Sequence, residues 1–238
     1  MNDQNRQPLL RVRGLEAWYG ESQALHGVDF DIYPGETVSF LGRNGVGKTT
    51  TLRALLGITS ARKGEITLNG RDMMKVPRHR VAACGFGYVP EERGIFATLT
   101  VEENLTLPPV VADGGMSIKD IYALFPNLEE RRTSQGTKLS GGEQQMLAIA
   151  RVLRTGAKMI LMDEPTEGLA PVIVQRIGEI LLDLKKRGLT VLLVEQNFRF
   201  AAKVADRFYV MDHGQIVEAF ATSELPAHHA RLNELLGV

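Results

Sequence analysis

The chain has almost no cysteine and no long apolar run. Its 238 residues contain a single cysteine, Cys84, which excludes an internal disulfide and a cysteine-based metal cluster. No segment approaches the roughly 18 consecutive apolar residues that a membrane-spanning helix requires. If the protein acts at a membrane, other chains must therefore cross it.

An excess of either charge is also missing. Lys+Arg and Asp+Glu number 28 each, so the formal net charge is +0. A balanced chain has no broad positive field to attract a polyanion, and we expect no nucleic-acid partner. Any anion must instead be bound locally, by a loop and the N-terminus of a helix. Such a site suits a nucleotide better than a polymer.

Three short apolar runs predict strands that are buried on both faces of a parallel sheet. They cover residues 38–41, 159–162 and 191–194. Helical patterns lie at 49–56 and at 171–186, where apolar residues repeat on one side of the helix. Alternating strands and helices predict an α/β core with its ligand at the carboxyl ends of the strands.

Other segments predict additions to this core. Residues 9–32 and 64–69 alternate in the manner of a small antiparallel sheet, and residues 208–219 predict a late hairpin. From about 91 to 153 helical patterns dominate, which indicates an inserted α-helical subdomain. We expect one domain over 1–238.

Residues 42–49 carry the clearest chemistry. They match G-x-x-x-x-G-K-[ST], in which backbone N–H groups surround phosphates, the lysine reaches the β and γ oxygens and the hydroxyl holds Mg²⁺. A chance match in this length is expected on the order of 0.01 times. Kinases, GTPases and recombinases share this phosphate loop. The predicted nucleotide-binding residues here are Gly42, Arg43, Asn44, Gly45, Val46, Gly47, Lys48, Thr49 and Thr50.

Two acidic residues follow the apolar run 159–162. Asp163 is expected to hold Mg²⁺ together with Thr49, because a strand end delivers its carboxylate to the phosphate loop. Glu164 is expected to polarise the water that attacks the γ-phosphate. Lys48 and Glu164 are therefore predicted catalytic residues.

The signature segment, residues 139–145, predicts the start of a second anion-binding helix. Ser140 is a good N-cap, and Glu143 stands at the third helical position, where it completes a capping box. Gly141 and Gly142 carry no side chains that would obstruct a ligand. Free N–H groups at such a helix end can bind a phosphate.

Together these motifs resemble the nucleotide-binding subunit of an ATP-binding cassette transporter, over nearly the whole chain. The resemblance implies a P-loop NTPase (RecA-like) core, ATP and Mg²⁺ as cofactors, and hydrolysis of ATP. It implies that Ser140, Gly141, Gly142 and Glu143 contact the ATP of a facing subunit, so that two subunits enclose two nucleotides. Tyr19 resembles the aromatic residue that stacks on adenine, with Trp18 as the neighbouring candidate.

Two residues depart from the family pattern. Glu91 stands where most relatives have a glutamine that senses Mg²⁺, and a carboxylate there can also coordinate the metal. Gln196 stands in place of a histidine, and its amide can donate a hydrogen bond to a γ-phosphate but cannot carry a proton or a charge. We therefore assign proton transfer to Glu164 and only a polar contact in the catalytic site to Gln196.

With these departures, residues 88–105, 163–171 and 194–197 resemble one ATPase subunit of the bacterial importer for branched-chain amino acids. That family implies transmembrane permease subunits, a second ATPase that is either another copy or a paralogue, and indirectly a periplasmic substrate-binding protein. It also implies a peripheral position on the cytoplasmic face of the inner (plasma) membrane. Ile95, Phe96 and Leu99 are candidate permease contacts or, equally, core residues.

Other classes of protein share parts of this pattern. An importer of urea or short-chain amides uses closely related machinery, and the ATPase of a lipid or drug exporter shares nearly every motif. A soluble kinase would lack the signature segment, and a DNA-repair ATPase would need a long coiled coil between Lys48 and Ser140, where the chain is too short for one.

Overall fold

The computed structural model describes residues 7–236; residues 1–6 and 237–238, part of the predicted domain 1–238, lie outside the described residues. Its centre is a six-stranded sheet in the order β10-β9-β3-β8-β7-β6. The strands are β3 (Thr37–Leu41), β6 (Phe86–Val89), β7 (Met159–Asp163), β8 (Thr190–Val194), β9 (Arg207–Asp212) and β10 (Gln215–Ala221). All neighbours pair in parallel except β10, which is antiparallel to β9. The predicted parallel core and late hairpin are confirmed.

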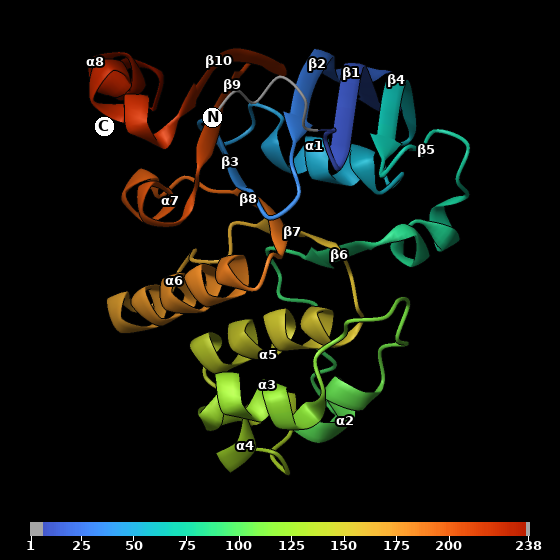
Figure 1. The fold of residues 1–238 in the computed structure, drawn as a ribbon, viewed down its shortest axis with the longest axis vertical. Coiled ribbons are helices and arrows are strands. Elements are labelled where there is room, and N and C mark those ends of the chain that lie inside the picture. The colour runs from blue at the N-terminus through green and yellow to red at the C-terminus, as the bar shows by residue number, and fades with distance from the viewer. Residues whose placement is uncertain (1–6, 237–238) are drawn as a thin grey trace.

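A second sheet of four antiparallel strands lies beside the first (Figure 1). It contains β1 (Leu10–Tyr19), β2 (Ser22–Ile32), β4 (Ala61–Leu68) and β5 (Arg71–Asp72). Aromatic rings join the two sheets, because Phe30 of β2 meets Phe40 of β3 edge-to-face at 4.9 Å between centroids. Tyr209 of β9 completes this cluster, 5.6 Å from Phe40.

Eight α-helices occupy the described residues. They are α1 (Lys48–Leu55), α2 (Val101–Thr106), α3 (Ile118–Leu124), α4 (Pro126–Glu130), α5 (Gly141–Arg154), α6 (Pro171–Lys186), α7 (Phe198–Val204) and α8 (Leu225–Leu236). Short 3₁₀ turns stand at Arg78–Arg80, Ala82–Cys84, Gly136–Lys138 and Thr222–Glu224. None of the helices in the described part of the chain is both long and apolar enough to span a membrane.

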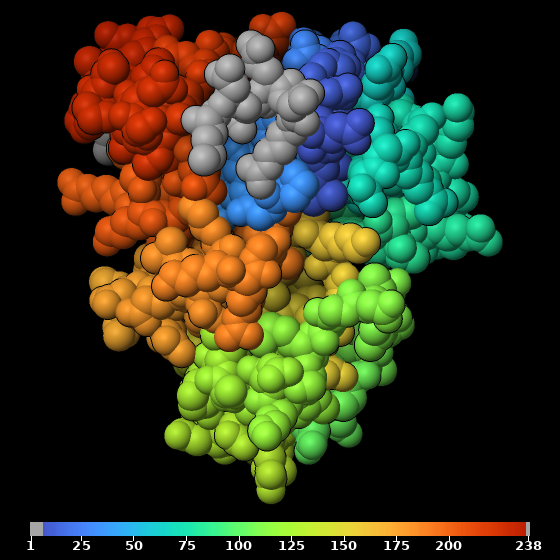
Figure 2. Space-filling view, viewed as in Figure 1, coloured from blue at the N-terminus to red at the C-terminus, as the bar shows by residue number. Residues whose placement is uncertain are grey.

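Helices α2 to α5 form the lower end of the molecule in Figure 1, away from the antiparallel sheet. The surface has the same division, with the green helical residues below the blue strands (Figure 2). One face of α5 is buried against this helical core and against β6, which explains the apolar positions Met146, Ile149 and Leu153. The predicted mixed fold, with a helical part between core strands, is confirmed.

Strand β6 was missed by the sequence argument. It is only four residues long, and Gly87 in its centre is typical of a turn. The structure uses this glycine for close packing, because a Cβ atom there would lie 2.3 Å from Val152 Cγ1 of α5. Because this glycine is required by packing against a helix that is distant in sequence, the segment itself does not have the pattern of a strand.

Candidate functional site

The phosphate loop, residues 42–49, connects the carboxyl end of β3 to the start of α1. Its backbone requires glycine, since Gly42, Gly45 and Gly47 have φ values of 151°, 81° and 110°. A Cβ atom on Gly42 would also lie 2.6 Å from the carbonyl oxygen of Met211 on β9. The loop can therefore turn tightly and present its N–H groups where the helix dipole favours an anion.

Lys48 reaches into this loop. Its side chain is 3% exposed, and Nζ donates to the carbonyl oxygens of Gly42 at 2.8 Å and Arg43 at 2.9 Å. Nζ also lies 3.5 Å from Glu164 Oε1. Burial lowers the pKa of the Lys48 ammonium, and the carboxylate of Glu164 opposes that shift. A poorly solvated cation inside a loop of N–H donors is suited to bind phosphate.

Asp163 lies at the end of β7 and points to the same place. The Thr49 hydroxyl donates to Oδ1 at 2.8 Å, and the Tyr88 hydroxyl of β6 donates to Oδ2 at 3.2 Å. Burial raises the pKa of the Asp163 carboxyl, although both hydrogen bonds oppose the shift. The structure thus joins two of the three predicted Mg²⁺ ligands, Thr49 and Asp163, by a direct hydrogen bond.

Glu164 has an unusual backbone. Its φ is 45°, in the left-handed region that residues with a side chain seldom adopt. Its N–H donates to the carbonyl oxygen of Val194 on β8 at 2.9 Å. Its Oε2 accepts a 2.6 Å hydrogen bond from Gln196 Nε2. The predicted base and the residue in place of the family histidine are therefore hydrogen-bonded to each other.

Lys48, Thr49 and Glu164 face a cavity of about 270 Å³. It is lined by Asn44, Gly45, Gly47, Lys48, Thr49, Thr50, Glu91 and Glu164. Its hydroxyl and carboxylate oxygens fit Mg²⁺, which takes one or two carboxylates and completes its shell with phosphate and water. Among residues 7–236, no group of three or more His, Cys, Asp or Glu side chains is placed to hold a metal ion by itself.

The remaining predicted loop residues have supporting contacts. The carbonyl oxygen of Val46 accepts from Gly214 N at 2.9 Å, which ties the loop to the hairpin of β9 and β10. Arg43 is exposed, and its Nη2 donates to the carbonyl oxygen of Glu234 in α8 at 3.3 Å.

The signature helix α5 begins as the sequence predicts. The Ser140 hydroxyl accepts from Glu143 N at 3.3 Å, and Glu143 Oε2 accepts from Ser140 N at 2.7 Å. Gly141 and Gly142 form the first turn. Among the described residues, no hydrogen bond or ion pair joins these four residues to residues 42–50, and none of the four lines the cavity.

The two candidate aromatic residues have different surroundings. Trp18 is half-buried, and Lys63 Nζ lies 5.2 Å from its ring centroid. Tyr19, the last residue of β1, is 39% exposed. Its phenol interacts with Arg53 of α1, which raises the pKa of that guanidinium. Tyr19 is therefore the more available of the two for a base.

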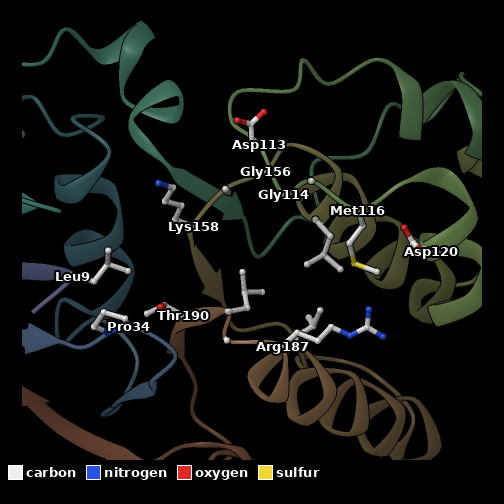
Figure 3. Close-up of a pocket in the computed structure, with 16 residues that line it drawn as sticks. Leu9, Pro34, Asp113, Gly114, Met116, Asp120, Gly156, Lys158, Arg187 and Thr190 are labelled. Atoms are coloured by element: carbon white, nitrogen blue, oxygen red, sulfur yellow. The ribbon is translucent and has the colours of Figure 1, made fainter.

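A wider hollow of about 610 Å³ lies elsewhere (Figure 3). Lys158 precedes β7 and Thr190 begins β8, so this hollow stands at the amino ends of the parallel strands. Ligands of such sheets bind at the opposite edge, where the phosphate loop is. The larger hollow therefore does not lie at the edge of the sheet where a nucleotide is expected to bind.

Sequence reasoning missed several residues that shape the site. Tyr88 was read only as part of a motif, and Arg93 was given no role. Arg93 Nη1 donates to Gln144 Oε1 on α5 at 2.9 Å, so the loop that follows Glu91 is tied to the signature helix. Glu195 is buried behind Glu164. An acidic residue at the end of the apolar run 191–194 is the one local signal that could have marked it.

Comparisons with known proteins agree with this geometry. The family model described as ABC transporter matches residues 25–167. The chain is 43% identical over 212 residues to the high-affinity branched-chain amino acid transport ATP-binding protein BraG of Pseudomonas aeruginosa, covering 88% of this chain and 91% of that one. It is 36% identical to the probable branched-chain amino acid transport ATP-binding protein LivF of Archaeoglobus fulgidus, covering 92% of this chain and 95% of that one.

An export protein is also similar. The lipopolysaccharide export system ATP-binding protein LptB of Haemophilus influenzae is 35% identical, with 88% of this chain and 89% of that one covered. Among solved structures, a nucleotide-free ATP-binding cassette from an ABC transporter superposes with a TM-score of 0.83 at 24% identity, over 98% of this chain and 99% of that one. The chain belongs to the ABC transporter family and is one of its ATP-binding, ATP-hydrolysing subunits.

Proposed function

We propose that this chain is an ATPase subunit of an importer for branched-chain, hydrophobic amino acids, and that Mg·ATP hydrolysis at its interface with a second ATPase drives uptake. The observation that carries the choice of substrate is the 43% identity to BraG over 88% of the chain. The residues that line the cavity catalyse ATP hydrolysis, and the transported solute binds to other chains.

Within the cavity each side chain has a separate task. Lys48 is a cation placed against phosphate oxygens, where it offsets the negative charge that moves during transfer of the γ-phosphoryl group. Glu164 accepts a proton from the attacking water, and Gln196 holds that carboxylate by the 2.6 Å hydrogen bond to Oε2. The products are ADP and phosphate.

The metal site consists of Thr49, Asp163 and Glu91. When bound there, Mg²⁺ neutralises charge on the β and γ oxygens of the nucleotide. Thr49 and Asp163 are already in contact at 2.8 Å, while Glu91 is exposed at the rim of the cavity. Replacing the usual glutamine by Glu91 adds a negative ligand, which increases the electrostatic attraction for the cation.

A second ATPase subunit completes each site through Ser140, Gly141, Gly142 and Glu143. This proposal is supported by their absence from the lining of the cavity and by the exposed position of Ser140 at the N-terminus of α5. If two copies pair, a mixture of the inactive variants Lys48→Ala and Ser140→Arg regains activity, because one of the two sites in the mixed dimer then contains neither change. Absence of recovery, with an active wild type, points to a paralogous partner.

The permease docks near the loop after β6. Phe96 is 43% exposed, and its ring lies 4.5 Å from Arg151 Cζ, whereas Ile95 packs against the helical core. Phe96 is therefore the apolar contact we assign to a cytoplasmic helix of the permease, and Ile95 is assigned to the core. In this arrangement the ATPase is peripheral, on the cytoplasmic face of the inner membrane.

Reconstitution tests the proposal. The chain is combined in vesicles with its permease, second ATPase and periplasmic binding protein, and phosphate release is measured with leucine or with urea. Leucine is expected to stimulate the wild type and to leave Glu164→Gln inactive. Stimulation by urea alone would replace the amino-acid importer by an importer of urea or short amides. The similarity to LptB supports an exporter as the second candidate, in which case the binding protein has no effect on the rate.

A further inference from the structure

A buried carboxylate stands behind the cavity and takes no part in the roles above. Glu195 follows β8 directly, and its N–H donates to the carbonyl oxygen of Phe40 on β3 at 3.2 Å. The residue is 2% exposed, so its carboxylate has little contact with water. A buried carboxylate is unfavourable unless donors surround it.

Both oxygens of Glu195 have protein donors. Oε1 accepts from the Thr166 hydroxyl at 2.7 Å and from the Thr166 N–H at 3.2 Å. Oε2 accepts from the N–H of Asn197 at 3.2 Å. Asp163 pairs with Val194 in the sheet, and Thr166 and Asn197 each stand three residues beyond that pair. One side chain therefore bridges the two turns that leave β7 and β8.

The hydrogen bonds of Glu195 continue the connection between β7 and β8 beyond the last backbone hydrogen bond. Glu164 N still bonds to the Val194 carbonyl oxygen at 2.9 Å, but Pro165 has no N–H to continue. The next available donor, Thr166 N, bonds to the Glu195 side chain instead. Side-chain hydrogen bonds thus extend the connection between the strands past the proline.

Glu164 and Gln196 lie inside this bridge. Glu164 keeps a φ of 45°, which persists only where the surrounding structure fixes the backbone on both sides. Gln196 lies between Glu195 and Asn197 in the chain, and the Glu195 carboxylate accepts a hydrogen bond from the Asn197 N–H. The 2.6 Å bond from Gln196 to Glu164 therefore spans two short segments that Glu195 holds together.

We propose that Glu195, acting through Thr166 and Asn197, is a positioning residue that holds the general base Glu164 and its partner Gln196 in reactive alignment. The proposal rests on the function proposed above for Glu164. Glu195 itself is not among the residues that line the cavity, and its carboxylate accepts hydrogen bonds from Thr166 and Asn197. Its removal should affect the rate of hydrolysis more than the binding of nucleotide.

A matched pair at Thr166 tests this most sharply. Thr166→Val removes the hydroxyl donor but keeps the branched shape and the N–H, while Thr166→Ser keeps both donors. Glu195→Gln is the complementary change, because its amide cannot accept from both turns. For each purified full chain, kcat and KM for ATP are measured in the complex, together with the dissociation constant of a fluorescent ATP analogue.

We expect kcat to fall about 10- to 100-fold in Thr166→Val and Glu195→Gln, the range that misplacement of a catalytic group produces. The dissociation constant should stay within about twofold of the wild-type value, and Thr166→Ser should restore kcat. If Glu195→Gln fails to fold, the Thr166 pair still decides.

Two results would overturn the proposal in distinguishable ways. Wild-type kcat in both Thr166→Val and Glu195→Gln, with Glu164→Gln inactive, removes the positioning role and leaves Glu164 as the base. A parallel loss of kcat and nucleotide affinity, not rescued by serine, makes the bridge merely structural. Hydrolysis by Glu164→Gln at the wild-type rate would instead refute the assignment of Glu164 as the general base, and with it the proposed role of Glu195.

Discussion

Replacing Glu195 by glutamine should change how the stability of the protein depends on pH. Burial raises the pKa of the Glu195 carboxyl to about 7 from its ordinary 4.5, while hydrogen bonds from Thr166 and Asn197 oppose the rise and the nearby Glu164 adds to it. The folded state therefore holds this proton more tightly than the unfolded chain does. The wild type gains stability from protonated Glu195 at low pH and loses it as pH rises toward 7.

The size of the effect follows from the two pKa values. A rise of this extent corresponds to about 3 kcal/mol of free energy of unfolding, lost in full above the folded-state pKa. Most of that loss, about 2–3 kcal/mol, falls between pH 5 and pH 8. Glutamine has no proton to exchange, so the variant lacks this component at every pH.

Urea unfolding, followed by the fluorescence of Trp18, measures the difference. Both proteins are unfolded without nucleotide at several pH values from 5 to 8. The free energy of unfolding of Glu195→Gln minus that of the wild type should increase by about 2–3 kcal/mol across this range. Groups that do not interact with Glu195 titrate in the same way in both proteins, so their contributions cancel in the difference. A difference that stays constant with pH would refute the reasoning, because it would mean that Glu195 ionises normally in the folded state.

Three further predictions concern the site and the core. Glu164→Gln should abolish phosphate release while ATP still closes the dimer, whereas Gln196→Ala should keep a partial rate because it removes only an orienting hydrogen bond; equal, complete loss in both would contradict this division. Lys48→Ala should weaken ATP binding about 10- to 100-fold in equilibrium dialysis, the value of a charge-assisted hydrogen bond, and unchanged affinity would remove Lys48 from the phosphate site. Phe125→Ala should lower the free energy of unfolding by about 3–5 kcal/mol, since the ring is 0% exposed in the helical core, and a loss below about 1 kcal/mol in urea unfolding would contradict that packing.

Local sequence patterns predicted the elements whose determining residues lie close together in the chain. Helix α6 spans Pro171–Lys186, the predicted bounds, because proline begins it, one face is apolar and Gly188 follows with a φ of 81°. The capping box of Ser140 and Glu143 was equally visible, since both partners lie within one turn of α5. Short-range rules are sufficient for such features.

Contacts between distant residues were not predictable in the same way. Glu195 meets Thr166 only because β7 and β8 are neighbours in the sheet. Gln196 was assigned a contact in the catalytic site, but the structure shows that its amide bonds to Glu164. Motifs identified the reacting groups, whereas the bonds that orient them depend on strand order, which no single segment encodes.

The central claim is that Lys48 of one subunit binds ATP and that Ser140 of a second subunit completes the same ATP site. Sedimentation velocity of Glu164→Gln, alone and with its cognate second ATPase, tests it most directly. With Mg·ATP the account predicts a shift from the mass of one chain to that of two, no shift with ADP, and no shift with ATP when Ser140→Arg is added to every ATPase chain present. A hydrolysis-arrested protein that keeps the mass of a single chain under all these conditions would contradict the account.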